Sequence, residues 1–189
     1  IGVSLNRMLR LKNQDSIITL FFGFFGVSLI AGFWAIPFAI NGLFHVALLS
    51  IAIILGFINR KRIIIYLQQI KSETQELTLF FRGLLFVVSI LILAQCASPP
   101  FLIDNESYYI QTIKWLNEYG FVNGLVNLHV FLGQTSGWHI LQSAFNFSFL
   151  YERFNDISGL ALLLGNIYAI LRLNAFITKK ETSKFNLVF

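Results

Sequence analysis

The sequence predicts an all-α integral membrane protein: a helical bundle of about four transmembrane helices, with amphipathic helices in an external loop. Three observations predict it. Of 189 residues, 56% are hydrophobic and only 12% are charged, about half the charged fraction of an ordinary soluble domain. Phenylalanine alone occurs 21 times, which a soluble domain of this size could not bury because its surface-to-volume ratio is large. Finally, four apolar stretches are long enough to cross a bilayer.

These stretches are the expected transmembrane spans. A spanning helix needs about 20 mostly apolar residues, and residues 16–34, 38–58, 77–97 and 157–177 qualify. Pro37 is expected in the first turn of the second span, where its missing N–H costs little. Backbone groups in lipid must pair within their own segment, so the spans should be helices. We expect residues 1–189 to form a single membrane domain.

Basic residues predict the orientation of the spans, because Lys and Arg are enriched in cytoplasmic loops. They flank the spans at Arg7, Arg10, Lys12, Arg60, Lys61, Arg62, Lys71, Lys179, Lys180 and Lys184. Arg82 and Arg172 lie within spans and are expected to snorkel toward the same side. Residues 98–156 contain only Lys114 and Arg153 as basic residues. In the inner (plasma) membrane of a bacterium, both ends of this multi-pass chain would be cytoplasmic and residues 98–156 extracytoplasmic.

Further features concern charge, cysteine and the chain ends. The net charge of +5 does not indicate nucleic-acid binding, because the basic residues sit at the ends of apolar spans. Cys96 is the single cysteine, so no intrachain disulfide forms.

Residues 59–76 have an amphipathic pattern and are either a helix along the membrane surface or a plain helical linker. Because the chain starts at Ile1 and ends soon after an apolar span, we expect a piece of a longer protein.

The external loop, residues 98–156, is where chemistry is expected, because long loops are often functional. One helix is predicted over about residues 105–119, closed by Gly120. A second should begin at Thr135 or Ser136 as N-cap and run to about Tyr151. Its expected buried face consists of Trp138, Leu141, Phe145 and Phe149. A turn region rich in glycine and asparagine separates the two helices.

Two carboxylates at the start of this loop have two interpretations. Asp104 is well placed to cap the first helix, and Glu106 would favour its positive N-terminus. Alternatively, a carboxylate just outside the membrane can take a proton from an acceptor hydroxyl and make it a nucleophile. A second acidic group two residues on could bind a divalent cation. Both interpretations hold together if the cap keeps the base rigid.

The loop carries a pattern that points to a family. The pattern runs Asp104, Tyr108-Tyr109, Gln111, Ile113-Lys114-Trp115, Glu118-Tyr119-Gly120, Val122, Gly124-Leu125, Asn127-Leu128-His129, Leu132-Gly133, Ser136 and Trp138. Over roughly residues 104–147 it resembles a family of large bacterial multi-pass proteins that look like GT-C-type glycosyltransferases. That family would place a histidine where this chain has Tyr109, and three spans rather than one precede the loop.

The resemblance implies a function and a set of residues. It implies transfer of a sugar from a polyprenyl-phosphate donor to an acceptor hydroxyl at the extracytoplasmic face, in cell-envelope glycan synthesis. Asp104 would be the catalytic base, and Glu106, Lys114 and His129 would bind substrate. A divalent cation (Mg or Mn) held by Asp104 and Glu106 is the only cofactor it implies. The expected partners are membrane lipid, a lipid-linked sugar, and a glycan, lipid or protein acceptor, with no nucleic acid.

Other function classes remain open at this stage. The first is a non-enzymatic membrane protein, such as a polysaccharide transporter, assembly factor or scaffold. A transporter should show polar or broken spans in paired halves, and the four spans show little of this. A protein like an O-antigen polymerase or ligase is another, although that class is expected to rely on arginines in the loop. His129 could bind phosphate or a hydroxyl, or be a hydrogen-bonded loop residue.

Overall fold

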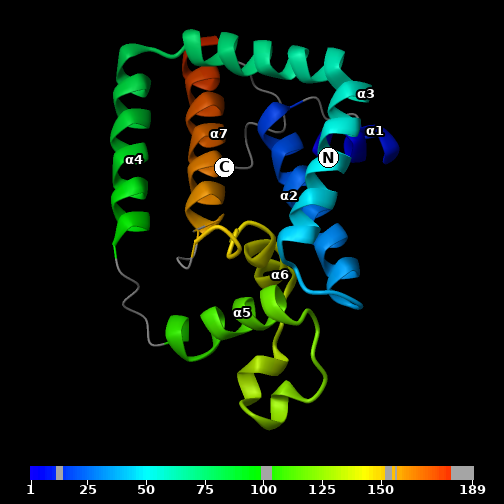
Figure 1. Cartoon of the computed structure of the whole chain (residues 1–189). Coiled ribbons are helices and arrows are strands. Elements are labelled where there is room, and N and C mark those ends of the chain that lie inside the picture. Colours follow the sequence, from blue (N-terminus) through cyan, green and yellow to red (C-terminus); the bar gives the residue numbers. More distant parts are fainter. Residues whose placement is uncertain (12–14, 99–103, 152–154, 156, 180–189) are drawn as a thin grey trace.

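The computed structural model describes residues 1–11, 15–98, 104–151, 155 and 157–179 (Figure 1). These residues form helices and turns without a strand, which confirms the all-α class. The helices are α1 (Gly2–Met8), α2 (Ser16–Ala35), α3 (Gly42–Gln75), α4 (Leu79–Ala97), α5 (Ile110–Glu118), α6 (Gly137–Ala144) and α7 (Ile157–Lys179). A π-helical turn, η1 (Asn105–Tyr109), leads into α5, and two short 3₁₀ turns, η2 (Leu125–Asn127) and η3 (Val130–Gly133), precede α6.

Four helices are long and apolar enough to cross a membrane: α2, α3, α4 and α7. They agree with the predicted spans, except that the second begins later than residue 38. Pro37 lies in the turn before α3, not in its first turn. Asn41 is the residue that caps α3, since its side chain accepts a hydrogen bond from the backbone N–H of Leu43 at 3.0 Å. The turn between α2 and α3 instead forms backbone hydrogen bonds with residues of the loop, at Leu116 and Phe121.

Helix α3 is continuous over 34 residues and bends sharply (Figure 1). Its first half runs beside α2, and its second half crosses one end of the bundle near the end of α7. The amphipathic segment predicted at residues 59–76 is therefore the continuation of the second span and not a separate linker. Asn59 is buried between α3 and α1, where its Nδ2 donates to Ser4 Oγ and to the Leu55 carbonyl, both at 2.9 Å.

Two clusters of buried apolar side chains hold the helices together. The larger joins α2, the start of α3, α5 and α6, and consists of Val27, Ala31, Ala35, Ile40, Phe44, Leu116, Leu141, Ala144 and Ile157. The smaller lies at the other end of the bundle and consists of Ile17, Leu77, Phe81, Ile170 and Leu171. Each cluster thus contains residues from distant parts of the chain, and together they fix both ends of α2.

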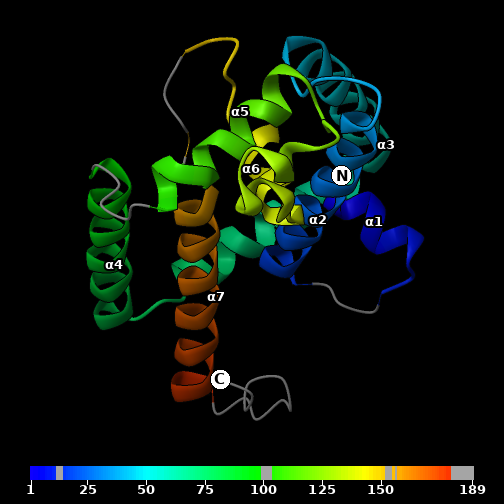
Figure 2. The ribbon, with the colours of Figure 1, turned by 90° about the horizontal axis from the view of Figure 1, so that it is seen from below.

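Helix α4 stands apart from the rest of the bundle and packs mainly on α7 (Figures 1 and 2). Only 6% of its most apolar window is buried. Large side chains such as Phe80, Phe86 and Leu91 are exposed along it. The exposed apolar surface of this helix is what a membrane span presents to lipid.

Helix α6 is shorter than the sequence predicts. It begins as expected after Ser136 but ends at Ala144, not near Tyr151. Its expected buried face is confirmed only in part. Leu141 is buried and Phe145 packs against the larger cluster, but Trp138 is 43% and Phe149 48% exposed. The chain leaves helical geometry at Phe145, with φ −107° and ψ 5°. Phe147 then has a positive φ of 49°, a conformation that a continuing right-handed helix excludes.

Candidate functional site

The loop segment, residues 104–151, packs on the turn between α2 and α3, at the end of the bundle opposite the second half of α3 (Figure 1). Backbone hydrogen bonds make the junction: Phe121 N donates to Ala35 O at 2.7 Å, and Ile40 N donates to Leu116 O at 2.9 Å. Such pairing satisfies backbone groups that burial would otherwise leave without partners. The loop segment is therefore a fixed part of the fold.

Buried Asn117 is the centre of this junction. Its Nδ2 donates to Ile40 O at 2.9 Å and to Ser143 O at 3.0 Å, and its Oδ1 accepts from Asn146 Nδ2 at 2.9 Å. One amide thereby joins α5, the α2–α3 turn and the end of α6.

Gly120 completes the junction in a way that no other residue could. It has a φ of +76°, and a Cβ there would lie 2.5 Å from the carbonyl oxygens of both Ala35 and Phe38. The predicted role of Gly120 at the end of the first loop helix is confirmed. Its close approach to the α2–α3 turn is a second reason why a glycine is needed at this position.

A cavity of about 360 Å³ opens within the loop segment, between α5, the turn at residues 120–126 and residues 132–135. Its volume falls within the usual range for small-molecule sites. Trp115 offers an aromatic face, and Asn123 and Thr135 offer polar groups. Thr112 is only 3% exposed, and its Oγ1 has no hydrogen-bond partner among the described residues. A buried hydroxyl without a partner is costly, and Thr112 is one of the residues that line this cavity.

The four residues predicted to act on substrate lie outside the lining of this cavity. Asp104, Glu106 and Lys114 are exposed along the η1–α5 helical run, and exposed His129 precedes η3. Asp104 lies roughly 12 Å from Thr112 along the helix, at about 1.5 Å per residue. The structure thus brings the predicted carboxylates to the same helix as the cavity but not into it.

The first carboxylate does not cap the helix as expected. Asp104 is itself helical, and its carboxylate accepts no hydrogen bond from the described residues. Glu106 is two positions away, and side chains at that spacing on a helix point apart. The pair therefore does not fit a shared cation site, and the described residues contain no group of three His, Cys, Asp or Glu that could hold a metal ion. The divalent cation stays a prediction.

Aromatic rings of η1 pack against the segment that contains His129 and Phe131. The ring centroid of Tyr108 lies 4.5 Å from that of Tyr109 and 4.9 Å from that of Phe131, and Phe131 lies 5.4 Å from His129. A hydrogen bond with Tyr109, followed by desolvation and the nearby Asp104 carboxylate, raises the pKa of Tyr108 to about 12. Tyr108 therefore stays a neutral hydrogen-bonding phenol at physiological pH.

His139 has a structural role at the start of α6. It forms a capping box with Ser136, whose backbone N–H donates to His139 Nδ1 at 3.1 Å. Nδ1 is therefore an acceptor, and a neutral ring carries its hydrogen on Nε2. Burial lowers the pKa of His139, which favours the neutral ring.

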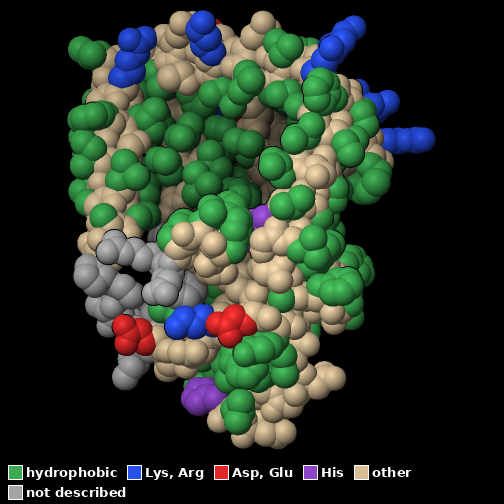
Figure 3. Space-filling view, in the orientation of Figure 1, with side chains coloured by type: hydrophobic (Ala, Val, Ile, Leu, Met, Phe, Trp, Pro, Cys, Tyr) green, Lys and Arg blue, Asp and Glu red, His purple; other side chains and the backbone are tan. Residues whose placement is uncertain are grey.

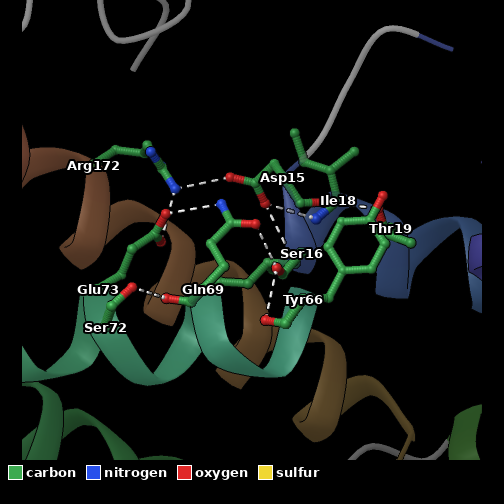
Figure 4. A network of polar contacts seen from close by, with 10 residues as sticks. Asp15, Ser16, Ile18, Thr19, Tyr66, Gln69, Ser72, Glu73 and Arg172 are labelled. Atoms are coloured by element: carbon green, nitrogen blue, oxygen red, sulfur yellow. Dashed lines mark hydrogen bonds and ion pairs between the residues drawn. The ribbon is translucent and has the colours of Figure 1, made fainter. Parts of the chain in front are cut away.

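The charged side chains divide between the two ends of the molecule (Figure 3). On the face shown, Lys and Arg gather along the second half of α3, while acidic side chains lie at the loop segment on either side of a basic one. At the α3 end, Arg172 of α7 lies on the side of the basic residues, as predicted, and two carboxylates hold it there. Its Nη2 lies 2.9 Å from Asp15 Oδ2 and 2.9 Å from Glu73 Oε2, which joins α7 to α2 and α3 (Figure 4).

Sequence reasoning missed the cavity residues Thr112, Trp115 and Asn123. The glycine- and asparagine-rich turn at residues 120–127 was the available signal, since such turns let a chain fold back around a ligand-sized space.

No curated protein and no solved structure matches the chain. A family model described as a domain of unknown function matches all of residues 1–189. The chain therefore belongs to that family, DUF8201.

Proposed function

We propose that this protein is a glycosyltransferase-like membrane protein that transfers a sugar from a polyprenyl-phosphate donor to an acceptor hydroxyl, in cell-envelope glycan synthesis. The observation that carries the proposal is the cavity beside the helix of Asp104. Its lining includes buried Thr112, whose Oγ1 has no hydrogen-bond partner among the described residues. A π-helical turn, a rare element frequent at functional sites, lies directly after Asp104.

The proposal includes an orientation in a bacterial inner membrane. Arg60, Lys61, Arg62 and Lys71 all belong to the second half of α3, and such clusters favour the cytoplasmic side. The loop segment, at the opposite end, would then face the extracytoplasmic side, and both ends of the chain would be cytoplasmic. This is the side on which a carboxylate at the headgroup plane could meet a lipid-linked sugar.

The lipid tail of the donor would lie against an apolar hollow between the helices. The face in Figure 3 is hollowed below the second half of α3, and hydrophobic side chains wall the hollow. Exposed apolar side chains on α4, such as Leu84 and Val87, add to the apolar surface on that side of the bundle. A polyisoprenoid chain is as apolar as these side chains, which supports a lipid-borne rather than a soluble donor.

The proposed chemistry uses the chain's own groups. Asp104 takes the proton of the acceptor hydroxyl, whose oxygen attacks the anomeric carbon while the bond to the lipid phosphate breaks. The phosphate leaves with the electron pair, and Lys114 and His129 offset its charge. Thr112, Trp115 and Asn123 hold the sugar ring in the cavity. Asp104 lies roughly 12 Å from Thr112. The donor sugar and the acceptor would together fill the distance between these two residues.

The experiment measures transfer from labelled polyprenyl-phosphate hexoses in membranes that contain the full-length protein. We expect Asp104→Asn to lower the rate by about 10²-fold or more, because it removes the base. Glu118→Gln is the matched control, since it removes another exposed carboxylate of the same helical run, and it should leave the rate unchanged. Thr112→Val and Trp115→Leu should raise KM more than they lower kcat. Full activity of normally inserted Asp104→Asn would refute the base assignment.

A further inference from the structure

A second cavity, of about 430 Å³, lies between α1 and the second half of α3. Three arginines line it: Arg7 from the last turn of α1, Arg10 just after that helix, and Arg62 from α3. Apolar Leu11 and Ile65 complete the rim. It lies at the end of the molecule away from the loop segment, so its role does not depend on the proposed function.

The end of α1 is built so that its arginines converge. Leu11 N donates to Asn6 O and Arg10 N donates to Arg7 O, at 3.1 and 3.2 Å, the two bonds of a Schellman motif. Arg10 occupies the left-handed position of this motif, with a φ of +50°, where glycine is the usual residue. An arginine is thus held in a conformation that favours glycine, at the mouth of a basic cavity.

Fixed polar groups form the wall of the cavity. Asn6 is 7% exposed, and its Nδ2 donates to Tyr66 Oη at 3.3 Å and to Thr19 Oγ1 at 3.4 Å. A phenol can accept and donate at the same time, so Tyr66 can still donate to an oxygen in the cavity. Asn6 and Tyr66 thereby position one hydroxyl donor beside the three guanidinium groups.

The charges in this cavity select the ligand class. Its lining contains no carboxylate among the described residues, and the nearby acids Asp15 and Glu73 are paired with Arg172. Guanidinium groups match phosphate oxygens with paired N–H donors. The rim of Leu11 and Ile65 suits a group that sits where apolar and polar surroundings meet.

We propose that this cavity binds a phosphate group. The group would be supplied either by the headgroup of an anionic lipid, since basic pockets of membrane proteins bind such headgroups, or by free phosphate. Arg7, Arg10 and Arg62 bind its oxygens, Tyr66 adds a neutral donor, and the apolar rim contacts the glycerol region when the source is a lipid.

The test measures the melting temperature of the full chain, because a ligand of the folded state raises it with concentration. In one arm, nanodiscs of phosphatidylcholine receive increasing phosphatidylglycerol; in the other, inorganic phosphate is added to phosphatidylcholine nanodiscs. Arg62→Gln and Arg10→Gly are the variants. Arg10→Gly removes the charge while favouring the backbone conformation already present, so a loss of binding cannot come from unfolding of α1. Arg60→Gln is the control, an exposed arginine on the same helix that does not line the cavity.

We expect a saturable rise in melting temperature in at least one arm. Each cavity variant should weaken the apparent affinity about fivefold or more, and the control should not change it. A response with phosphatidylglycerol alone identifies a lipid headgroup as the source, and a response with inorganic phosphate identifies free phosphate. No saturable response in either arm, or an equal loss in Arg60→Gln, overturns the proposal.

Discussion

Arg172 Nη2 lies 2.9 Å from Oδ2 of Asp15, although the two residues are 157 positions apart in the chain. Asp15 also caps α2, because its Oδ1 accepts from the backbone N–H groups of Ile17 and Ile18 at 2.8 and 3.1 Å. The side chains of Arg172 and Asp15 are only 23% and 13% exposed, so solvent screens this pair less than a surface pair. One carboxylate therefore begins α2 and binds it to α7.

We expect Arg172→Gln to lower the free energy of unfolding by about 1–3 kcal/mol, because it leaves two partly buried carboxylates without their charged partner. Titration with a denaturing detergent, followed by circular dichroism, would measure the change. Arg60→Gln, at an exposed arginine with no ion pair among the described residues, should change stability little. Equal effects of the two substitutions would show that the Arg172 pairs contribute nothing specific.

Two substitutions of Asp15 should separate its two roles. Asp15→Asn keeps an oxygen that can cap α2 but loses the charge that faces Arg172. Asp15→Ala loses both, and we expect it to cost about 1 kcal/mol more than Asp15→Asn, the usual value of an N-cap. The same detergent titration would compare them. Identical stabilities of the two variants would mean that the cap contributes nothing.

Gly120 and Gly124 form a matched pair, since both have positive φ, +76° and +84°. At Gly124 the nearest atom to an added Cβ is 3.5 Å away, on the Asn127 side chain, whereas Gly120 faces two backbone oxygens at 2.5 Å. We expect Gly124→Ala to cost about 1 kcal/mol, from backbone conformation alone. Gly120→Ala should cost clearly more and expose the loop segment to protease in reconstituted vesicles. Similar behaviour of both variants would contradict the junction.

The raised pKa of Tyr108 predicts a dependence of stability on alkaline pH. Its ordinary pKa is 10.0 and its folded value is about 12. Because the folded value is the higher one, the stabilisation is complete below pH 10.0 and is lost as pH rises through about 12. Tyr109→Phe removes the largest cause, so we expect the phenol of Tyr108 to ionise at lower pH. Ultraviolet titration of tyrosinate, with Tyr108→Phe to assign the signal, would measure it; an unchanged titration would contradict the Tyr108–Tyr109 hydrogen bond.

The spans could be predicted because hydropathy is a local property. Residues 16–34 and 157–177 agree with α2 and α7 to within two residues. Arg82 could also be anticipated, since its guanidinium turns back to donate to Gln75 O at 2.7 Å. The start of α3 was missed because the α2–α3 turn is shaped by Leu116 and Asn117, residues of a distant helix that leave no local pattern.

The candidate site was less predictable than the fold. Asp104 and Lys114 could be noticed by residue type and position, but the cavity depends on how residues 120–135 fold against α5. Thr112 in particular looks like an ordinary helical residue in sequence, and only tertiary packing makes its hydroxyl buried without a partner. The partners of Arg172 were missed for the same reason, since Asp15 and Glu73 come from two other helices.

The isolation of α4 has a consequence for how substitutions along the chain should be tolerated. With only 6% of its apolar window inside the protein, this helix is held in place largely by its own partitioning into hydrocarbon. Exchanges among leucine, isoleucine, valine and phenylalanine on its outward side should therefore accumulate almost freely. A single lysine or aspartate at its centre would instead cost about 2.5–3.5 kcal/mol of insertion energy, so variation there is limited by lipid solubility and not by shape.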